Sequence, residues 1–355
     1  MKAFAIAAVI ACAVAGGTRA GAGVAPAWAD QQDPPHEKKL VHTDHAMGTV
    51  VQVTIWSDDE VAAAAAAQAV FAEMRRLDAM MTTWTPDSEI SQINTAAGNG
   101  KPVKVSDEAF TVIARSVDIS RQSKGIFDIT VGAYSGMWKF DQDMDGTLPA
   151  PADVAARREL VNWKDIVLDK RKKTVRLKRA GMKITLGGIA KGYAVDRAAA
   201  VMDHAGFGDF IIQAGGDMYV SGSKSGTSWV VGIRDPRGTR DQSFAIAPVR
   251  DHSFSTSGDY ERGFVKDGVR YHHILDPRTG QPSRASRSVT IMAKDAFTAD
   301  AWSKVLFILG AKQAMPLVEK LPNFEAVFVD DANRVIVSSG LLPTLKVLSE
   351  PTPGV

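Results

Sequence analysis

The 355-residue sequence has a single cysteine, Cys12, near the start of the chain. If the first 29 residues are removed, as argued below, the rest of the chain has no cysteine and needs no disulfide. This scarcity excludes a small disulfide-stabilised domain. It also removes the risk of a stray disulfide, which suits an oxidising compartment such as the periplasm.

The sequence also lacks a hydrophobic run long enough for a spanning helix. A positive Lys2 precedes an apolar run over residues 3–15, and Ala27, Trp28 and Ala29 form a small-residue cleavage site. The run is shorter than the ~20 residues that a spanning helix needs. We therefore expect residues 1–29 to be a secretory signal peptide and the protein to be periplasmic. The alternative is a membrane-anchored lipoprotein, processed at Cys12.

No charge of one sign dominates. Removing residues 1–29 takes away Lys2 and Arg19 and no acidic residue, which leaves 40 basic residues against 40 acidic ones. This balance gives no support to nucleic-acid binding, and we expect no nucleic-acid partner. With 45% hydrophobic and 23% charged residues, the chain has the composition of a globular protein with a large core.

The order of expected elements predicts the fold class. Residues 30–39 are polar and contain two prolines, so we expect a mobile leader before a folded domain over residues 40–350. The acidic loop near 141–151 is the most plausible seam between two lobes. Strands and helices do not alternate regularly, which favours an α+β fold over a doubly wound sheet. Helices are predicted at 60–80, 107–122, 153–160, 190–204 and 299–309, and strands at 50–55, 166–168, 174–177, 183–186, 210–213, 218–220, 229–233, 244–249, 271–274, 288–293, 326–329 and 335–337.

A glycine turn over residues 185–196 (TLGGIAKGYAVD) is the strongest local motif. It leads from an expected strand into a helix, where free amides attract phosphate. The spacing fits neither a P-loop nor a dinucleotide-binding fingerprint. A phosphate site and a plain packing turn both remain open on the spacing alone.

A second motif contains two histidines and an Asp-Pro turn, over residues 272–280 (HHILDPRTG). An imidazole at such a place can act as a general base, with His273 as the base and Asp276 as the residue that orients it. A purely structural histidine at the end of a strand is the alternative for His273 taken alone.

Taken together, the motifs resemble the ApbE family of FAD:protein FMN transferases from about His45 to Gly310. The resemblance implies an α+β, T-fold-related domain with two lobes of mixed sheets and packed helices. The matching segments are Met47-Gly48-Thr49, residues 86–90 (PDSEI), residues 125–132 (GIFDITVG), the glycine turn, Gly215-Gly216-Asp217, Thr256-Ser257-Gly258, the Asp276–Gly280 turn and Ala299-Asp300-Ala301.

The resemblance also implies which residues bind FAD and a metal ion. The residues expected to contact FAD are Met47, Trp84, Ile126, Phe127, Asp128, Thr185, Lys191 and Ile274. In the family, magnesium bridges the pyrophosphate to a carbonyl at Gly188, a carboxylate at Asp300 and a threonine hydroxyl four residues later. This chain has Lys304 at the last position, and Thr185 where the family usually has aspartate.

Lys304 leaves two arrangements open. On a helix it lies one turn after Asp300, so its ammonium can reach the metal's place. Alternatively, Lys304 turns to solvent, and Asp300, the Gly188 carbonyl and the Ser303 hydroxyl hold magnesium with the phosphates.

The resemblance predicts an enzyme that cleaves FAD at its pyrophosphate. It attaches FMN through a phosphoester to a threonine or serine of an exported electron-transfer protein and releases AMP. The acceptor is expected to carry an Asp-Gly-x-Ser/Thr-Gly/Ala-Ser/Thr type sequence. An FAD-binding carrier without transfer activity and an FAD pyrophosphatase are the alternatives.

Overall fold

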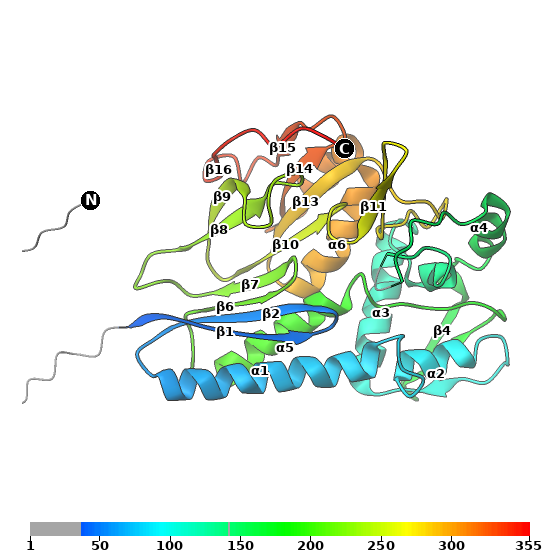
Figure 1. Ribbon diagram of the computed structural model, residues 1–355. Helices are drawn as coiled ribbons and strands as arrows, with labels where there is room; N and C mark the ends of the chain where they lie inside the picture. Colours follow the sequence, from blue (N-terminus) through cyan, green and yellow to red (C-terminus); the bar gives the residue numbers. More distant parts are fainter. Residues whose placement is uncertain (1–36, 141–142) are drawn as a thin grey trace, which may run out of the picture. The chain divides into compact units, whose positions relative to one another are not determined.

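The computed structural model describes residues 37–140 and 143–355 (Figure 1). The expected signal peptide and Cys12 lie outside the described residues. Strand β1 (Lys38–Ala46) begins two residues before Leu40, the expected start of the folded domain. Lys38 and Lys39, which we assigned to the leader, therefore pair with strand β2 (Thr49–Ser57).

An eight-stranded sheet forms the centre of the described structure, and each strand is antiparallel to its neighbours (Figure 1). Its order is β1, β2, β6 (Phe210–Ala214), β7 (Asp217–Ser221), β10 (His252–Gly258), β13 (Ser286–Ala293), β14 (Glu325–Asp330) and β15 (Val335–Val337). The strands expected at 210–213 and 218–220 are present as β6 and β7, and they pair as a hairpin.

The sheet lies between two hydrophobic clusters, as alternation along a strand requires. In β14, Ala326 and Phe328 contribute to the cluster under the helices. Val327 and Val329 contribute to the cluster on the other face, which the strands β8 (Trp229–Arg234) and β9 (Ser243–Val249) complete. Strand β16 (Lys346–Val347) pairs with β9, and both of its residues are exposed.

Among the helices that contribute to the first cluster are α1 (Glu60–Met81), α5 (Ala190–His204) and α6 (Ala296–Leu309). The helix expected at 60–80 is present as α1, and Asp59 caps its start by accepting from the Ala62 amide at 2.8 Å. The other helices are α2 (Glu89–Thr95), α3 (Asp107–Gln122), α4 (Pro151–Arg158) and α7 (Ala311–Val318).

The remaining elements are short. They are the sheet of β3 (Val103–Lys104), β4 (Ile166–Asp169) and β5 (Thr174–Leu177), the hairpin of β11 (Gly263–Lys266) and β12 (Val269–His272), and the 3-10 turns η1 (Ile129–Tyr134) and η2 (Trp163–Asp165). A third cluster, Tyr134, Trp138, Phe140 and Val154, lies around η1 and α4.

The expected α+β class is confirmed, and contacts group residues 37–355 into one compact unit. Two lobes with a seam near 141–151 stay a prediction. In the part of the chain that the structure describes, no helix has the length and apolar character needed to cross a membrane.

Two strand predictions were wrong. Residues 183–186 form no strand, because their backbone is held by a side chain and a turn: Ile184 exchanges hydrogen bonds with the amide of Asn94, and the Thr185 amide donates to Ile129 O. The strand expected over 271–274 ends at His272, so His273 follows it.

Candidate active site

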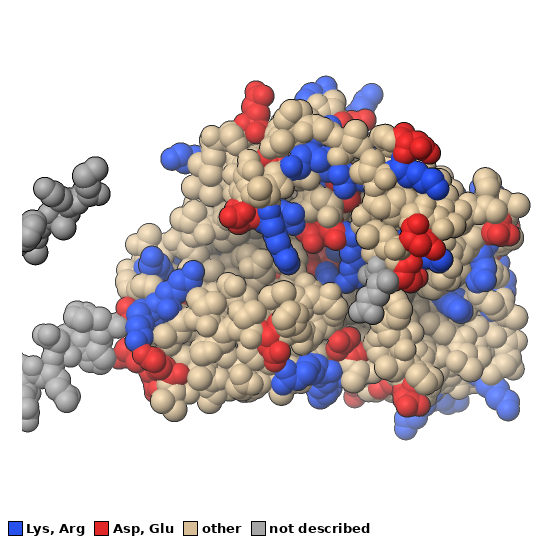
Figure 2. All heavy atoms as spheres, in the orientation of Figure 1, with Lys and Arg blue, Asp and Glu red and all other residues tan. Residues whose placement is uncertain are grey.

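The glycine turn meets two other predicted segments at the start of α5. A Cβ built on Gly188 would lie 3.3 Å from Cε2 of Phe127 and 3.9 Å from Cγ of Lys304. Residues that we assigned to flavin binding and to metal binding therefore lie at one place. Figure 2 shows acidic and basic side chains together in a hollow on one face, over the region where Figure 1 draws β10 and α6.

Gly192 allows α5 to approach α6 closely. A Cβ at this position would lie 2.2 Å from the Ala296 carbonyl oxygen and 2.6 Å from Cβ of Asp300. The close approach lets the Gly192 amide donate to Oδ2 of Asp300 at 2.8 Å. The other carboxylate oxygen, Oδ1, accepts from the Lys304 ammonium.

The Asp300 side chain is fully buried, and the Lys304 side chain is only 15% exposed. Burial opposes the charge of Asp300, but Lys304 and Lys191 outweigh it and lower the pKa of Asp300. The carboxylate is therefore ionised at neutral pH and has a partner on each oxygen.

Lys191 forms a second ion pair, with Asp217 at the start of β7. The Asp217 side chain is 1% exposed and that of Lys191 23% exposed. Burial works against the ammonium, but Asp217 and Asp300 raise the pKa of Lys191 above its ordinary value. Lys191 is thus a permanent cation between two carboxylates, next to the glycine turn.

His273 lies directly after β12 and is exposed to solvent. Its Nδ1 lies 3.3 Å from the carbonyl oxygen of Arg262. A carbonyl oxygen only accepts hydrogen bonds, so this contact places the proton on Nδ1 and leaves Nε2 as the acceptor. The Arg262 guanidinium donates to the Gly48 carbonyl at 3.3 Å, which connects His273 to the β1–β2 turn.

Although His273 is solvent-accessible, protein surrounds it closely enough for desolvation to be the first cause of a lowered pKa. The positive charges of His272, Arg262 and Lys304 lower it further, and together they bring the pKa of His273 to about 3. The ring is therefore neutral at neutral pH and has an unprotonated Nε2.

Asp276 does not orient His273, contrary to our expectation. Its carboxylate forms hydrogen bonds with the Arg278 guanidinium at 2.6–3.1 Å and with the Arg278 amide at 2.9 Å. These contacts stabilise the Asp-Pro turn. The hydrogen bond of the His273 ring is with the Arg262 carbonyl oxygen, which takes the orienting position instead.

The residues expected to contact the flavin are in several environments. Ile126, Phe127 and Ile274 are buried in the core, whereas Trp84 is 76% exposed. Met47 has a left-handed backbone (φ 53°) at the β1–β2 turn, and its amide donates to Asp78 Oδ2 at 2.8 Å. The Thr185 hydroxyl accepts from the Gly187 amide at 3.3 Å and so supports the glycine turn.

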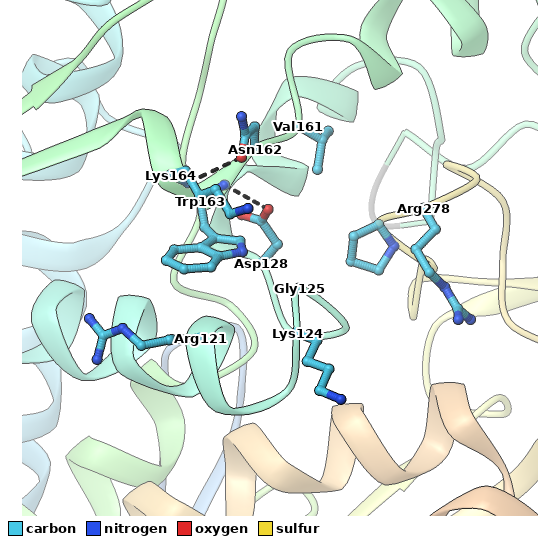
Figure 3. Close-up of a pocket in the computed structure, with 10 residues that line it drawn as sticks. Arg121, Lys124, Gly125, Asp128, Val161, Asn162, Trp163, Lys164 and Arg278 are labelled. Carbon is cyan, nitrogen blue, oxygen red and sulfur yellow. Dashed lines mark hydrogen bonds between the residues drawn. The ribbon is translucent and has the colours of Figure 1, made fainter.

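Asp128 is buried, and its carboxylate is used within the protein. Oδ1 accepts from the Thr130 amide (2.8 Å) and hydroxyl (2.6 Å), and Oδ2 accepts from the Trp163 amide (2.9 Å). Burial outweighs these bonds and raises the pKa of Asp128. Figure 3 shows the carboxylate turned toward the backbone of Trp163.

A pocket of about 420 Å³ lies beside Asp128. It is lined by Arg121, Lys124, Gly125, Asp128, Val161, Asn162, Trp163, Lys164, Pro277 and Arg278 (Figure 3). Asp128 alone among the predicted site residues lines it. We therefore locate the candidate active site at the charged cluster of Lys191, Asp217, Asp300 and Lys304 with His273, and not at this pocket.

The residues at this cluster do not fit magnesium. Both oxygens of Asp300 have partners, and one of them is an ammonium. The Ser303 hydroxyl donates to the Asp300 carbonyl oxygen at 2.7 Å and lies 2.7 Å from the Ser257 hydroxyl. Among residues 37–140 and 143–355, no group of three His, Cys, Asp or Glu side chains is placed to hold a metal ion.

Sequence reasoning missed two residues of this site. Asp217 belonged to a recognised motif, Gly215-Gly216-Asp217, but nothing local indicated that it pairs with Lys191. No sequence motif indicated Arg262, because its contact with His273 depends on how β11 and β12 pair.

Comparisons with known proteins point to one family. The ApbE family profile matches residues 47–328. A protein of Treponema pallidum named FAD:protein FMN transferase is 31% identical over 318 residues, 85% of this chain and 87% of the relative. A Klebsiella pneumoniae protein of the same name is 31% identical and covers 82% of this chain and 90% of its own length.

Solved structures give the same result. The ApbE protein of Thermotoga maritima superimposes with a TM-score of 0.79 at 32% identity, over 86% of this chain and 99% of that one. The flavin transferase ApbE of Vibrio cholerae gives 0.77 at 25% identity, over 87% of this chain and 99% of that one. This chain belongs to the ApbE family.

Proposed function

We propose that the chain is an FAD:protein FMN transferase. The hydroxyl oxygen of an acceptor threonine or serine forms a bond to the phosphorus of the FMN half of FAD. The bond from that phosphorus to the bridging oxygen breaks, and AMP leaves with the bridging oxygen. The hydroxyl proton passes first to a base and then to solvent, so the products are the FMN phosphoester and AMP.

One observation carries the proposal: the exposed His273 has Nδ1 3.3 Å from the Arg262 carbonyl oxygen, which leaves Nε2 as a proton acceptor, and the positive charges of Arg262 and Lys304 act on the same ring. Cations beside an acceptor nitrogen suit attack on a pyrophosphate, because they offset negative charge while the base takes the proton. The low pKa keeps Nε2 unprotonated at neutral pH. Family membership and the names of the relatives support the same reaction.

We assign FAD binding to the residues that the family resemblance indicates, of which Phe127 lies beside the glycine turn. The side chains of Met47, Trp84, Ile126, Phe127 and Ile274 suit the flat rings, and Thr185 holds the turn in shape. Lys191 attracts the pyrophosphate. Asp128 acts through the backbone of the adjoining loops, since its carboxylate is already used there.

One incubation tests the function. Purified protein without residues 1–29 is mixed with FAD and an acceptor fragment that carries an Asp-Gly-x-Ser/Thr-Gly/Ala-Ser/Thr type sequence. Transfer gives AMP and an acceptor heavier by FMN. AMP with free FMN would identify an FAD pyrophosphatase, and FAD binding without AMP would identify a carrier.

We further propose that the protein is exported to the periplasm, where an electron-transfer protein with such a sequence is its partner. The support is the sequence of residues 1–29. Mass spectrometry of the periplasmic fraction is expected to find a mature chain that starts near Asp30. An uncleaved chain, or a lipid on Cys12 in the membrane fraction, would contradict export by this route.

A further inference from the structure

Lys304 occupies the position from which a divalent ion would reach Asp300. Its ammonium contacts Oδ1 of Asp300, and the Gly192 amide takes Oδ2. Magnesium requires oxygen ligands in near-octahedral geometry at short range. A second cation at Oδ1 would have to displace the ammonium or lie beside it against electrostatic repulsion.

Packing holds Lys304 in this position. Cγ of Lys304 lies 3.9 Å from the place of a Cβ on Gly188, so the stem runs along the glycine turn. The side chain is 15% exposed and its carboxylate partner is fully buried. Turning the ammonium to solvent would break the ion pair of the buried Asp300 carboxylate and leave Oδ1 without its partner, which is unfavourable. The alternative in which Lys304 points to solvent is therefore disfavoured.

The other proposed metal ligand is also engaged. The Ser303 hydroxyl has one proton, which it donates to the Asp300 carbonyl oxygen at 2.7 Å. Its oxygen lies 2.7 Å from the Ser257 hydroxyl, which then donates to it. Ser303 is fully buried, so this hydroxyl ties α6 to β10 and does not face the glycine turn.

Lys191 and Asp217 complete an alternating arrangement of charges. Lys304 pairs with Asp300, Lys191 pairs with Asp217, and both lysines act on Asp300. Oδ1 of Asp217 is buried and has no hydrogen-bond partner among the described residues, so Lys191 is the neighbour that offsets its charge. The two ammonium groups balance two carboxylates without any further cation.

We propose that Lys304 replaces the divalent ion in this chain, so that FAD is held at its pyrophosphate by Lys304 and Lys191 and binds without metal. This inference rests on the proposed function, because it concerns the same FAD site. A lysine ammonium is an effective point charge for phosphate oxygens. The single charge of the ammonium attracts the pyrophosphate less strongly than a divalent ion would, but FAD binding then does not depend on the supply of metal.

The test measures FAD binding by quenching of flavin fluorescence, and Mn²⁺ binding by electron paramagnetic resonance with the metal alone. In the wild type, the FAD affinity is expected to be the same in excess EDTA and in added Mg²⁺, and the protein is expected to leave Mn²⁺ free. Either loss of FAD binding in EDTA that Mg²⁺ restores, or stoichiometric Mn²⁺ binding, would overturn the proposal.

Two variants sharpen the test. Lys304→Thr is expected to bind FAD at least about tenfold more weakly in EDTA, to recover with Mg²⁺, and to bind Mn²⁺. Lys304→Met is expected to lose the same affinity without recovery. Lys312→Thr, exposed on α7, is the matched control and is expected to behave as the wild type.

The measurements on the wild type need no variant to fold, so the proposal stays testable if the substitutions destabilise the protein. They also separate this inference from the proposed function. FAD binding that depends on Mg²⁺ overturns only the role of Lys304. Absence of FAD binding in both EDTA and Mg²⁺ overturns the proposed function together with the inference.

Discussion

Gly192→Ala is a direct test of the helix contact that builds the site. The new methyl group would lie 2.2 Å from the Ala296 carbonyl oxygen and 2.6 Å from Cβ of Asp300, so α5 and α6 have to separate. The separation also weakens the hydrogen bond from the Gly192 amide to Asp300. Both effects act at buried atoms of the core.

The magnitude follows from three contributions to the free energy of unfolding. Overpacking costs about 1–3 kcal/mol. Loss of a hydrogen bond to a charged group costs about 1.5–3 kcal/mol. Alanine is better than glycine inside a helix by about 1 kcal/mol, which offsets part of the loss. We expect Gly192→Ala to be destabilised by about 2–5 kcal/mol.

Urea unfolding followed by circular dichroism measures this change, and an equal slope in both proteins shows that the same surface is exposed. Gly208→Ala is the matched control, because a Cβ there meets no atom within 4 Å. The control is expected to change stability little. If Gly192→Ala is as stable as the control, the close approach of α5 and α6 described here is wrong.

Three further outcomes are expected. His273→Asn retains FAD binding but slows transfer by roughly 10²-fold or more, and normal turnover would remove His273 from the reaction. The pKa of His273 is lowered to about 3 in the folded protein, so as the pH falls below about 6.5 this residue takes up a proton in the unfolded chain before it does in the folded one. The free energy of unfolding of the wild type should therefore fall relative to that of His273→Asn between pH 6.5 and pH 4. A difference between the two proteins that stays constant with pH in urea unfolding would contradict the lowered pKa. In Asp128→Asn, the new side-chain NH2 group would face the amide of Thr130 or of Trp163, and two donors cannot form a hydrogen bond with each other. The free energy of unfolding should fall by about 1–3 kcal/mol. A thermal midpoint equal to that of the wild type would contradict this role of Asp128.

The sequence patterns did not predict a strand where the buried positions of that strand are polar. Strand β10 was not predicted, because Ser253, Ser255 and Ser257 occupy its buried positions and break the apolar alternation. The structure satisfies them through side-chain bonds, such as that of Ser253 Oγ to Met218 O at 2.9 Å. Edge strand β1 was missed for a related reason, since five of its nine residues are exposed.

Interactions between residues close together in the sequence determined several of the other elements. Helices α3 and α5 have the bounds that were predicted, because apolar spacing acts within a few residues, and in α3 the Ser106 side chain also caps the start. The residue types at the glycine turn and around His273 allowed a phosphate site and a general base but left a packing turn and a structural histidine open, and these stay predictions. The sequence also placed Lys304 one helical turn after Asp300, where a lysine and an aspartate are neighbours in any helix.

Tertiary structure alone decided how these groups are connected. The Gly192 amide and Asp300 are 108 residues apart, and they meet only because a glycine lets α5 pack closely against α6. Lys191 and Asp217 meet because α5 packs beside β7, and the Arg262 carbonyl replaces Asp276 at His273 because β11 pairs with β12. Such contacts depend on the packing of whole elements, which no local pattern of residues specifies.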